Sequence, residues 1–115
     1  MSTFEITNRT TEDISILLIS GELDAHTAPE LEKALQGLIE EKKYRIVVNF
    51  SDLLYISSAG LGVFMAYIED LRELGGDIKL SNMTPKVFNV FDLLGFPTLY
   101  DIMDKEEEAI AKFRE

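Results

Sequence analysis

Residues 45–62 read RIVVNFSDLLYISSAGLG, and this stretch decides the class of fold. Its first part, Arg45–Phe50, is a β-branched apolar run, which is typical of a strand buried inside a parallel sheet. A short polar break with two serines follows. From about Ala59 to Leu74, apolar side chains recur at helical spacing, and Gly75-Gly76 then stops the helix. A buried strand that leads into an amphipathic helix predicts an α/β domain.

Strand and helix signals alternate on both sides of this unit. Before it, two strands form a hairpin-like pair, and a helix follows the capping-box pattern that begins at Thr27. After it, Thr84-Pro85 opens another helix, which Gly95 ends. The predicted strands are 4–8, 14–19, 45–50, 77–80 and 99–103, and the predicted helices follow Thr27 and span 59–74, 84–94 and 104–113.

This order, β-β-α-β-α-β-α-β-α, predicts a single α/β domain over residues 1–115. Its sheet would be mixed but mostly parallel, with about five strands and four helices. Right-handed crossovers would place the helices on the faces of the sheet. Because the polar breaks after the strands are short, they would gather at one end, where α/β folds usually carry their sites.

The chain has 115 residues and a net charge of −10, from 21 acidic and 11 basic residues. An acidic surface repels nucleic-acid backbones and anionic lipid, so we expect no nucleic acid and no membrane as partners, and proteins with basic surfaces instead. The absence of cysteine excludes disulfides, zinc–thiolate sites and cysteine catalysis. Because the amino terminus lacks a signal-peptide pattern and no apolar run reaches ~20 residues, we expect a cytoplasmic protein.

The two serines of the polar break are the most informative candidates for function. If Ala59 opens the helix, Ser57 or Ser58 is its N-cap, and the hydroxyl faces the free N–H groups and the positive end of the helix dipole. A phosphate placed there would meet an anion-binding site and would change the surface charge sharply. The alternative is a serine that caps the helix and is never modified.

This loop lacks residues that serine catalysis or phosphate binding by a glycine-rich loop would require. Acyl transfer by a serine needs a general base, and His26 is the one histidine in the chain, beside the capping box and more typical of an exposed loop. The residues Gly60-Leu61-Gly62 match neither a phosphate-binding loop nor a dinucleotide-binding motif. We therefore expect a protein that is not an enzyme and that needs no cofactor.

A metal site is also a weak hypothesis. Glu22, Asp24 and Asp52 would lie near the strand-end face and could in principle hold Mg²⁺. Solvated turn and cap residues are the commoner explanation, so no metal is expected. Near the end of the chain, Phe96 follows a helix stop, and a partly exposed ring there would offer a contact to another protein.

Three stretches, 21–24, 45–53 and 55–62, together resemble one known family along almost the whole chain. They are similar to the Gly-Glu-Leu-Asp segment, the central strand with its turn, and the phosphorylation loop of the STAS-domain anti-sigma factor antagonists. These are small bacterial proteins of the partner-switching type. Thr84-Pro85 and Leu94-Gly95 also fall where that family has a proline-initiated helix and a glycine-containing turn.

The resemblance implies a single STAS domain and a phosphorylation cycle. The family's phosphorylated serine falls on Ser58, with Ser57 as the alternative acceptor, because Ser57 stands where the family usually has an aspartate. The unphosphorylated antagonist would bind an anti-sigma factor that is a GHKL-type serine kinase, and phosphorylation would release it. A PP2C-like phosphatase would reset the cycle. The partner-binding residues would be Glu22, Asp24, His26, Ser57, Ser58, Ala59, Gly60, Leu61 and Gly62.

Two other functions compete with this expectation. The first is a STAS scaffold or transporter-associated subunit that is never phosphorylated. The second is a small hydrolase, which the missing general base argues against.

Overall fold

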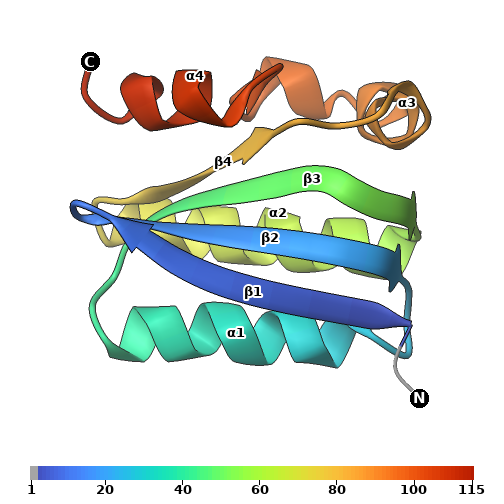
Figure 1. Cartoon of the computed structure of the whole chain (residues 1–115), viewed down its shortest axis with the longest axis horizontal. Helices are drawn as coiled ribbons and strands as arrows, with labels where there is room; N and C mark the ends of the chain where they lie inside the picture. The colour runs from blue at the N-terminus through green and yellow to red at the C-terminus, as the bar shows by residue number, and fades with distance from the viewer. Residues whose placement is uncertain (1–2) are drawn as a thin grey trace.

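A five-stranded mixed sheet runs through the computed structural model, which describes residues 3–115 (Figure 1). Its strands follow one another in the order β1-β2-β3-β4-β5; β1 and β2 are antiparallel, and each later pair is parallel. The elements are β1 (Phe4–Thr11), β2 (Ile14–Leu23), α1 (Ala28–Glu40), β3 (Arg45–Ile56), α2 (Ser58–Glu73), β4 (Asp77–Ser81), α3 (Pro85–Leu93), the 3-10 helix η1 (Phe96–Thr98), β5 (Ile102–Met103) and α4 (Glu106–Lys112).

The predicted element order is confirmed, with η1 as an addition between α3 and β5. Residues 1 and 2 of the predicted domain range lie outside the described residues. None of the helices formed by residues 3–115 combines the length and apolar character that crossing a bilayer requires.

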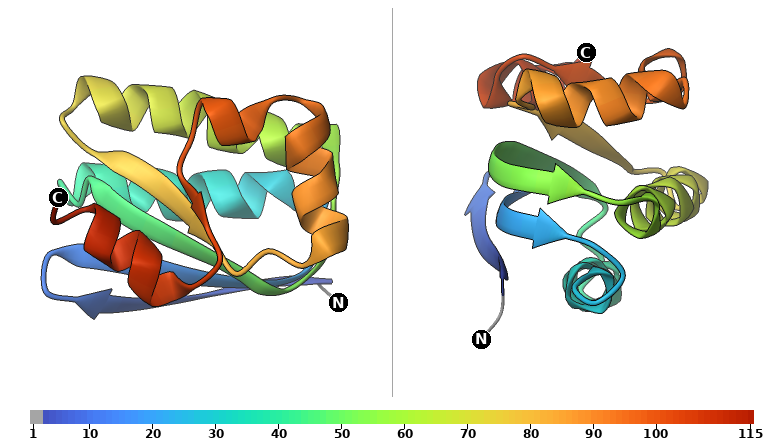
Figure 2. Two further views of the ribbon diagram at one scale, coloured as in Figure 1. Left: turned by 90° about the horizontal axis from the view of Figure 1, so that it is seen from above. Right: turned by 90° about the vertical axis from the view of Figure 1, so that its right-hand side faces the viewer.

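The helices cover the two faces of the sheet unequally. Figure 2 shows α1 and α2 on one side of the sheet and α4 on the other. The main core lies on the α1 and α2 side and includes side chains from α3 and η1. A smaller cluster, formed by Ile14, Ile16, Val47 and Ala109, packs under α4. The expected apolar stripe of α2 is buried except at Met65, which is partly exposed.

Aromatic rings connect α2, α3 and η1 to the centre of the sheet. Phe91 meets Phe50 edge-on with ring centroids 5.6 Å apart and meets Phe96 at 5.1 Å. The expectation of an exposed Phe96 is therefore wrong, because its ring is buried in the main core. Gly95, at φ 76°, turns the chain so that the ring points inward. The exposed apolar side chains in this region are Leu93, Leu94 and Leu99.

Strand β3 is longer than predicted, and its extra length carries it to the start of α2. The polar residues Ser51 and Asp52 suggested a loop, but pairing with β2 continues from Ser20↔Asp52 to Leu23↔Ile56. Two register shifts in β2–β3 accompany this extension. Each gives β3 one more residue than β2, since Leu18–Ser20 faces Asn49–Asp52 and Gly21–Glu22 faces Leu53–Tyr55. Such bulges re-aim side chains next to a loop.

Candidate functional site

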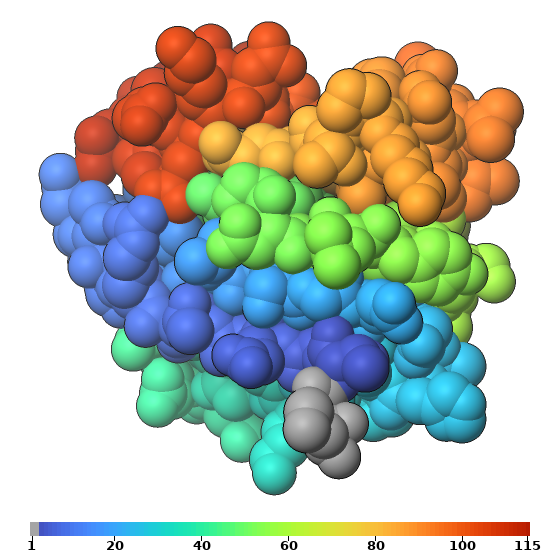
Figure 3. All heavy atoms as spheres, turned by 45° about the vertical axis from the view of Figure 1, so that its right-hand side comes forward, coloured from blue at the N-terminus to red at the C-terminus, as the bar shows by residue number. Residues whose placement is uncertain are grey.

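The carboxyl ends of β2 and β3 and the amino ends of α1 and α2 meet at one edge of the sheet (Figure 1). The backbone N–H of Ser57 donates to the carbonyl oxygen of Leu23 at 2.9 Å, which joins the end of β3 to the end of β2. Figure 3 turns this end forward and shows the segments after β2 and β3 as adjoining parts of one surface. We name it the Ser58 edge and define it by Glu22, Asp24, His26, Ser57, Ser58, Ala59, Gly60, Leu61 and Gly62.

Ser57 and Ser58 occupy different environments at this edge. Ser57 takes the N-cap position of α2, with extended backbone angles of φ −100° and ψ 173°. Its Oγ is buried and has no hydrogen-bond partner within residues 3–115. Ser58 is the first residue of α2, one position earlier than the predicted start at Ala59, and it is exposed. Of the two hydroxyl-bearing side chains, Ser58 is therefore the one that solvent reaches more readily.

Gly60 lets the first turn of α2 lie directly on the strand ends. A Cβ added at Gly60 would come within 2.8 Å of Leu23 Cγ and 3.0 Å of Ile56 Cγ1. Both neighbours are buried core side chains. At Gly62, by contrast, an added Cβ would meet nothing within 4 Å.

Gly60→Ala is expected to lower the free energy of unfolding by about 1–2 kcal/mol, because the new methyl group overpacks this contact. Gly62→Ala is the matched control, and it should raise the free energy of unfolding by up to about 1 kcal/mol through helix propensity. Urea denaturation followed by circular dichroism would measure both changes. Equal effects from the two substitutions would contradict the close packing at Gly60.

The loop between β2 and α1 is held by Asp24 and Thr27. One carboxylate oxygen of Asp24, Oδ1, accepts from the backbone N–H groups of His26 at 2.9 Å and Thr27 at 3.1 Å. The hydroxyl of Thr27 donates to the carbonyl of Glu22 at 2.9 Å and accepts from the N–H of Asp24, also at 2.9 Å. Thr27 does take the predicted N-cap position, but its side chain makes no cap hydrogen bond. The loop already uses the hydroxyl, so the predicted capping box is absent.

The segments that build this edge lack positive charge. Residues 10–32 and 46–71 contain no lysine or arginine. Glu22 is exposed, and Asp52 lies on β3 opposite Ser20 of β2. The positive end of the α2 dipole is the main opposing field at this surface. A further negative charge would therefore be added to an already acidic surface.

Two exposed apolar side chains lie just before Ser57, and the sequence prediction missed them. Leu54 is 67% exposed and Tyr55 46%, while Leu53 and Ile56 on either side are buried. The run of four apolar residues at 53–56 could have indicated this exposure, because successive side chains of a strand cannot all face one core. Apolar area beside a polar loop is the usual composition of a protein-binding surface.

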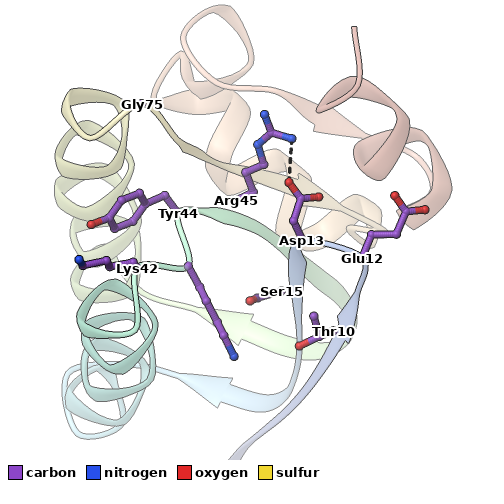
Figure 4. A pocket seen from close by; sticks show the side chains of 9 residues that line it. Thr10, Glu12, Asp13, Ser15, Lys42, Tyr44, Arg45 and Gly75 are labelled. Carbon is purple, nitrogen blue, oxygen red and sulfur yellow. Dashed lines mark hydrogen bonds and ion pairs between the residues drawn. The ribbon is translucent and has the colours of Figure 1, made fainter.

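Outside the Ser58 edge, the structure offers weaker candidate sites. A hollow of about 320 Å³ lies at the opposite end of the sheet, where the β1–β2 turn meets the start of β3 (Figure 4). Its lining includes Lys42, Lys43 and Arg45, but Arg45 pairs with Asp13 at 3.1 Å and Lys43 pairs with Glu41 at 3.3 Å. Acidic partners thus offset much of its positive charge. Within residues 3–115, no three His, Asp or Glu side chains gather where they could hold a metal ion.

Comparisons with known proteins bear on the same region. Residues 5–109 match the family model of the STAS domain, so the match spans both segments of the Ser58 edge. The anti-sigma-B factor antagonist of Bacillus subtilis is 33% identical over 92 residues, which cover 80% of this chain and 84% of that protein.

Solved structures show the same fold. An anti-sigma factor antagonist from Mycobacterium paratuberculosis superimposes with a TM-score of 0.89 at 22% identity, over 97% of this chain and 95% of that one. The unphosphorylated anti-sigma factor antagonist SpoIIAA gives a TM-score of 0.80 at 27% identity, over 96% of each chain. The phosphorylated form of the Bacillus protein SpoIIAA gives 0.72 at 25% identity, over 96% of this chain and 98% of that one.

Proposed function

Since this chain belongs to the STAS domain family, and its relatives include anti-sigma factor antagonists, we propose that it binds an anti-sigma factor through the Ser58 edge. We further propose that phosphorylation of Ser58 releases it, and that residues 1–115 act as one domain. The observation that carries this proposal is the exposed Ser58 at the start of α2, on a surface without lysine or arginine in its segments.

The choice of Ser58 over Ser57 rests on access. A kinase must bring the γ-phosphate of ATP to the serine oxygen. The oxygen bonds to the γ-phosphorus and gives its proton to a base of the kinase, while ADP leaves. The Oγ of Ser57 is buried beneath the start of α2, whereas Ser58 is exposed. Phosphorylation of Ser57 would first require its Oγ to leave this buried position. Ser58 needs no such change, so it is the proposed acceptor.

Charge supplies the proposed release mechanism. A phosphate brings about −1.5 to −2 charge at pH 7. On an edge that also carries Glu22 and Asp24, and inside a packed interface, it would be repelled and would lose its hydration. The α2 dipole would stabilise the phosphate in the free protein. Phosphorylation should therefore leave the protein folded while the complex dissociates. A loss of ~3 kcal/mol corresponds to more than a hundredfold in affinity.

Ser57 stands where the family usually has an aspartate, and this position affects the size of the switch. A neutral side chain leaves the unphosphorylated edge with one negative charge fewer. Phosphorylation then starts from a less negative local charge, which should increase the relative difference in charge between the unphosphorylated and phosphorylated states. The proposed partners are an anti-sigma factor that is a GHKL-type serine kinase and a PP2C-like phosphatase.

Intact-mass spectrometry tests the proposed modification. The chain would be incubated with ATP and an anti-sigma factor kinase of the GHKL type that binds it. A gain of about 80 Da is expected for the wild type and for Ser57→Ala, and no gain for Ser58→Ala. A gain that persists in Ser58→Ala would assign the phosphate to another residue. No gain in any variant would favour a STAS scaffold that is never phosphorylated.

A further inference from the structure

Helices α1 and α2 lie on the face of the sheet opposite α4 (Figure 2). Residues of both helices line a groove. It consists of two adjoining hollows of about 360 and 590 Å³ that share Gln36, Glu40 and Tyr67. The hydroxyl of Tyr67 donates to Oε1 of Gln36 at 3.1 Å and bridges the two helices. None of these residues belongs to the Ser58 edge, so the groove is a separate surface.

The groove is acidic. Its lining carries four carboxylates and one lysine: Glu32, Glu40, Asp70, Glu73 and Lys33. The negative charge of the groove affects Tyr67. Burial, Glu32 and Asp70 together raise the pKa of its phenol above the usual value of 10.0. Because four carboxylates face one ammonium group, the groove favours a ligand with several positive charges.

Apolar and small residues lie between these charges. Ile39 is partly buried, Leu74 is 47% exposed, and both line the groove. Gly37 lies within α1, in the turn before its last residue, Glu40, and a glycine inside a helix costs about 1 kcal/mol relative to alanine. A Cβ at Gly37 would meet nothing within 4 Å, so the packing of the chain itself does not require glycine there. The missing side chain keeps the groove open.

We propose that this groove binds one amphipathic helix of a partner protein, with its apolar stripe on Gly37, Ile39 and Leu74 and its flanking lysines and arginines on the carboxylates. Helices dock in this way by laying an apolar face into a groove. The 13 residues of α1 make a helix about 20 Å long, which matches three to four turns of a ligand helix. A second copy of this chain would bind the groove less well, because its net charge of −10 has the same sign as the charge of the groove and would be repelled.

The test uses two synthetic amphipathic peptides of 13 residues, the length of α1. Both carry the same leucine stripe; one has lysine and arginine on its flanks and the other has glutamate. Each is titrated into the ¹⁵N-labelled full chain, and amide shifts are followed by NMR. The basic peptide is expected to shift the amides of Gln36, Gly37 and Tyr67, and the acidic peptide is expected to leave them unchanged.

Two substitutions separate groove binding from loss of fold. Gly37→Leu should fill the groove and weaken the basic peptide at least tenfold, while leaving the fold intact and Tm unchanged or higher. Ala111→Leu, on the exposed side of α4, is the matched control and should bind the peptide like the wild type. Ser58→Asp should also bind it normally, which distinguishes this proposal from the function proposed for the Ser58 edge.

Several results would overturn the proposal. They are equal binding of both peptides, shifts centred on another acidic surface such as the start of α4, and unchanged binding by Gly37→Leu. Concentration-dependent shifts at the groove without any peptide would identify a second copy as the occupant and would equally contradict a partner helix.

Discussion

Ser58→Asp is expected to weaken binding of the anti-sigma factor by about thirtyfold or more, a loss of ~2 kcal/mol. The aspartate would place a permanent charge at the exposed first residue of α2, on the same edge that carries Glu22 and Asp24. In the complex this charge would lose its hydration without gaining a partner. The N-terminal dipole of α2 tolerates a carboxylate, so the variant should fold normally.

Matched variants separate charge from size at this position. Ser58→Asn has nearly the same shape as Ser58→Asp but no charge, and it should bind close to the wild-type affinity. Ser58→Ala should keep binding the anti-sigma factor with ATP present, because no acceptor hydroxyl remains. Isothermal titration calorimetry would measure all three variants. Tight binding by Ser58→Asp, or equal loss in Ser58→Asn, would contradict release by charge.

Phe91→Ala is expected to lower the free energy of unfolding by about 3–5 kcal/mol. Phe91 is fully buried and its ring contacts both Phe50 on β3 and Phe96 on η1. Truncation removes these contacts and leaves a cavity under α3. Since small domains have total stabilities of about 5–15 kcal/mol, the loss would approach complete unfolding.

Leu93→Ala provides the control for Phe91→Ala on the same helix. Leu93 is 85% exposed, so its truncation should change the stability by no more than about 0.5 kcal/mol. Urea denaturation followed by circular dichroism gives both values from the transition midpoints. A cost below about 1.5 kcal/mol for Phe91→Ala would show that α3 is not anchored through this ring.

The element order could be predicted from local patterns, whereas the length of β3 could not. Polar Ser51 and Asp52 are typical of a loop, and the continued pairing with β2, from Asp52 onward, depends on two bulges that involve residues about 30 positions away. Without that register, the exposure of Leu54 and Tyr55 could not be assigned. The burial of Phe96 similarly depends on rings from β3 and α3, which the local helix-stop signal does not reveal.

At the Ser58 edge, the sequence predicted which segments would meet but not how their side chains would be used. Short loops after parallel strands necessarily gather at one end of a sheet, so 22–26 and 57–62 could be placed together in advance. The hydroxyl of Thr27 had several possible partners, and the choice of Glu22 and Asp24 over a helix cap depends on the exact loop path. The different exposure of Ser57 and Ser58 depends on where α2 begins.

Direct comparison of the phosphorylated and unphosphorylated chain would test the central claim. Each form, with its phosphate position determined by peptide mass spectrometry, would be titrated with the anti-sigma factor under identical salt conditions. The account predicts phosphate on Ser58 and an affinity lower by more than about a hundredfold in the modified form, or ~3 kcal/mol. Equal affinity of the two forms, or a phosphate on Ser57, would contradict it.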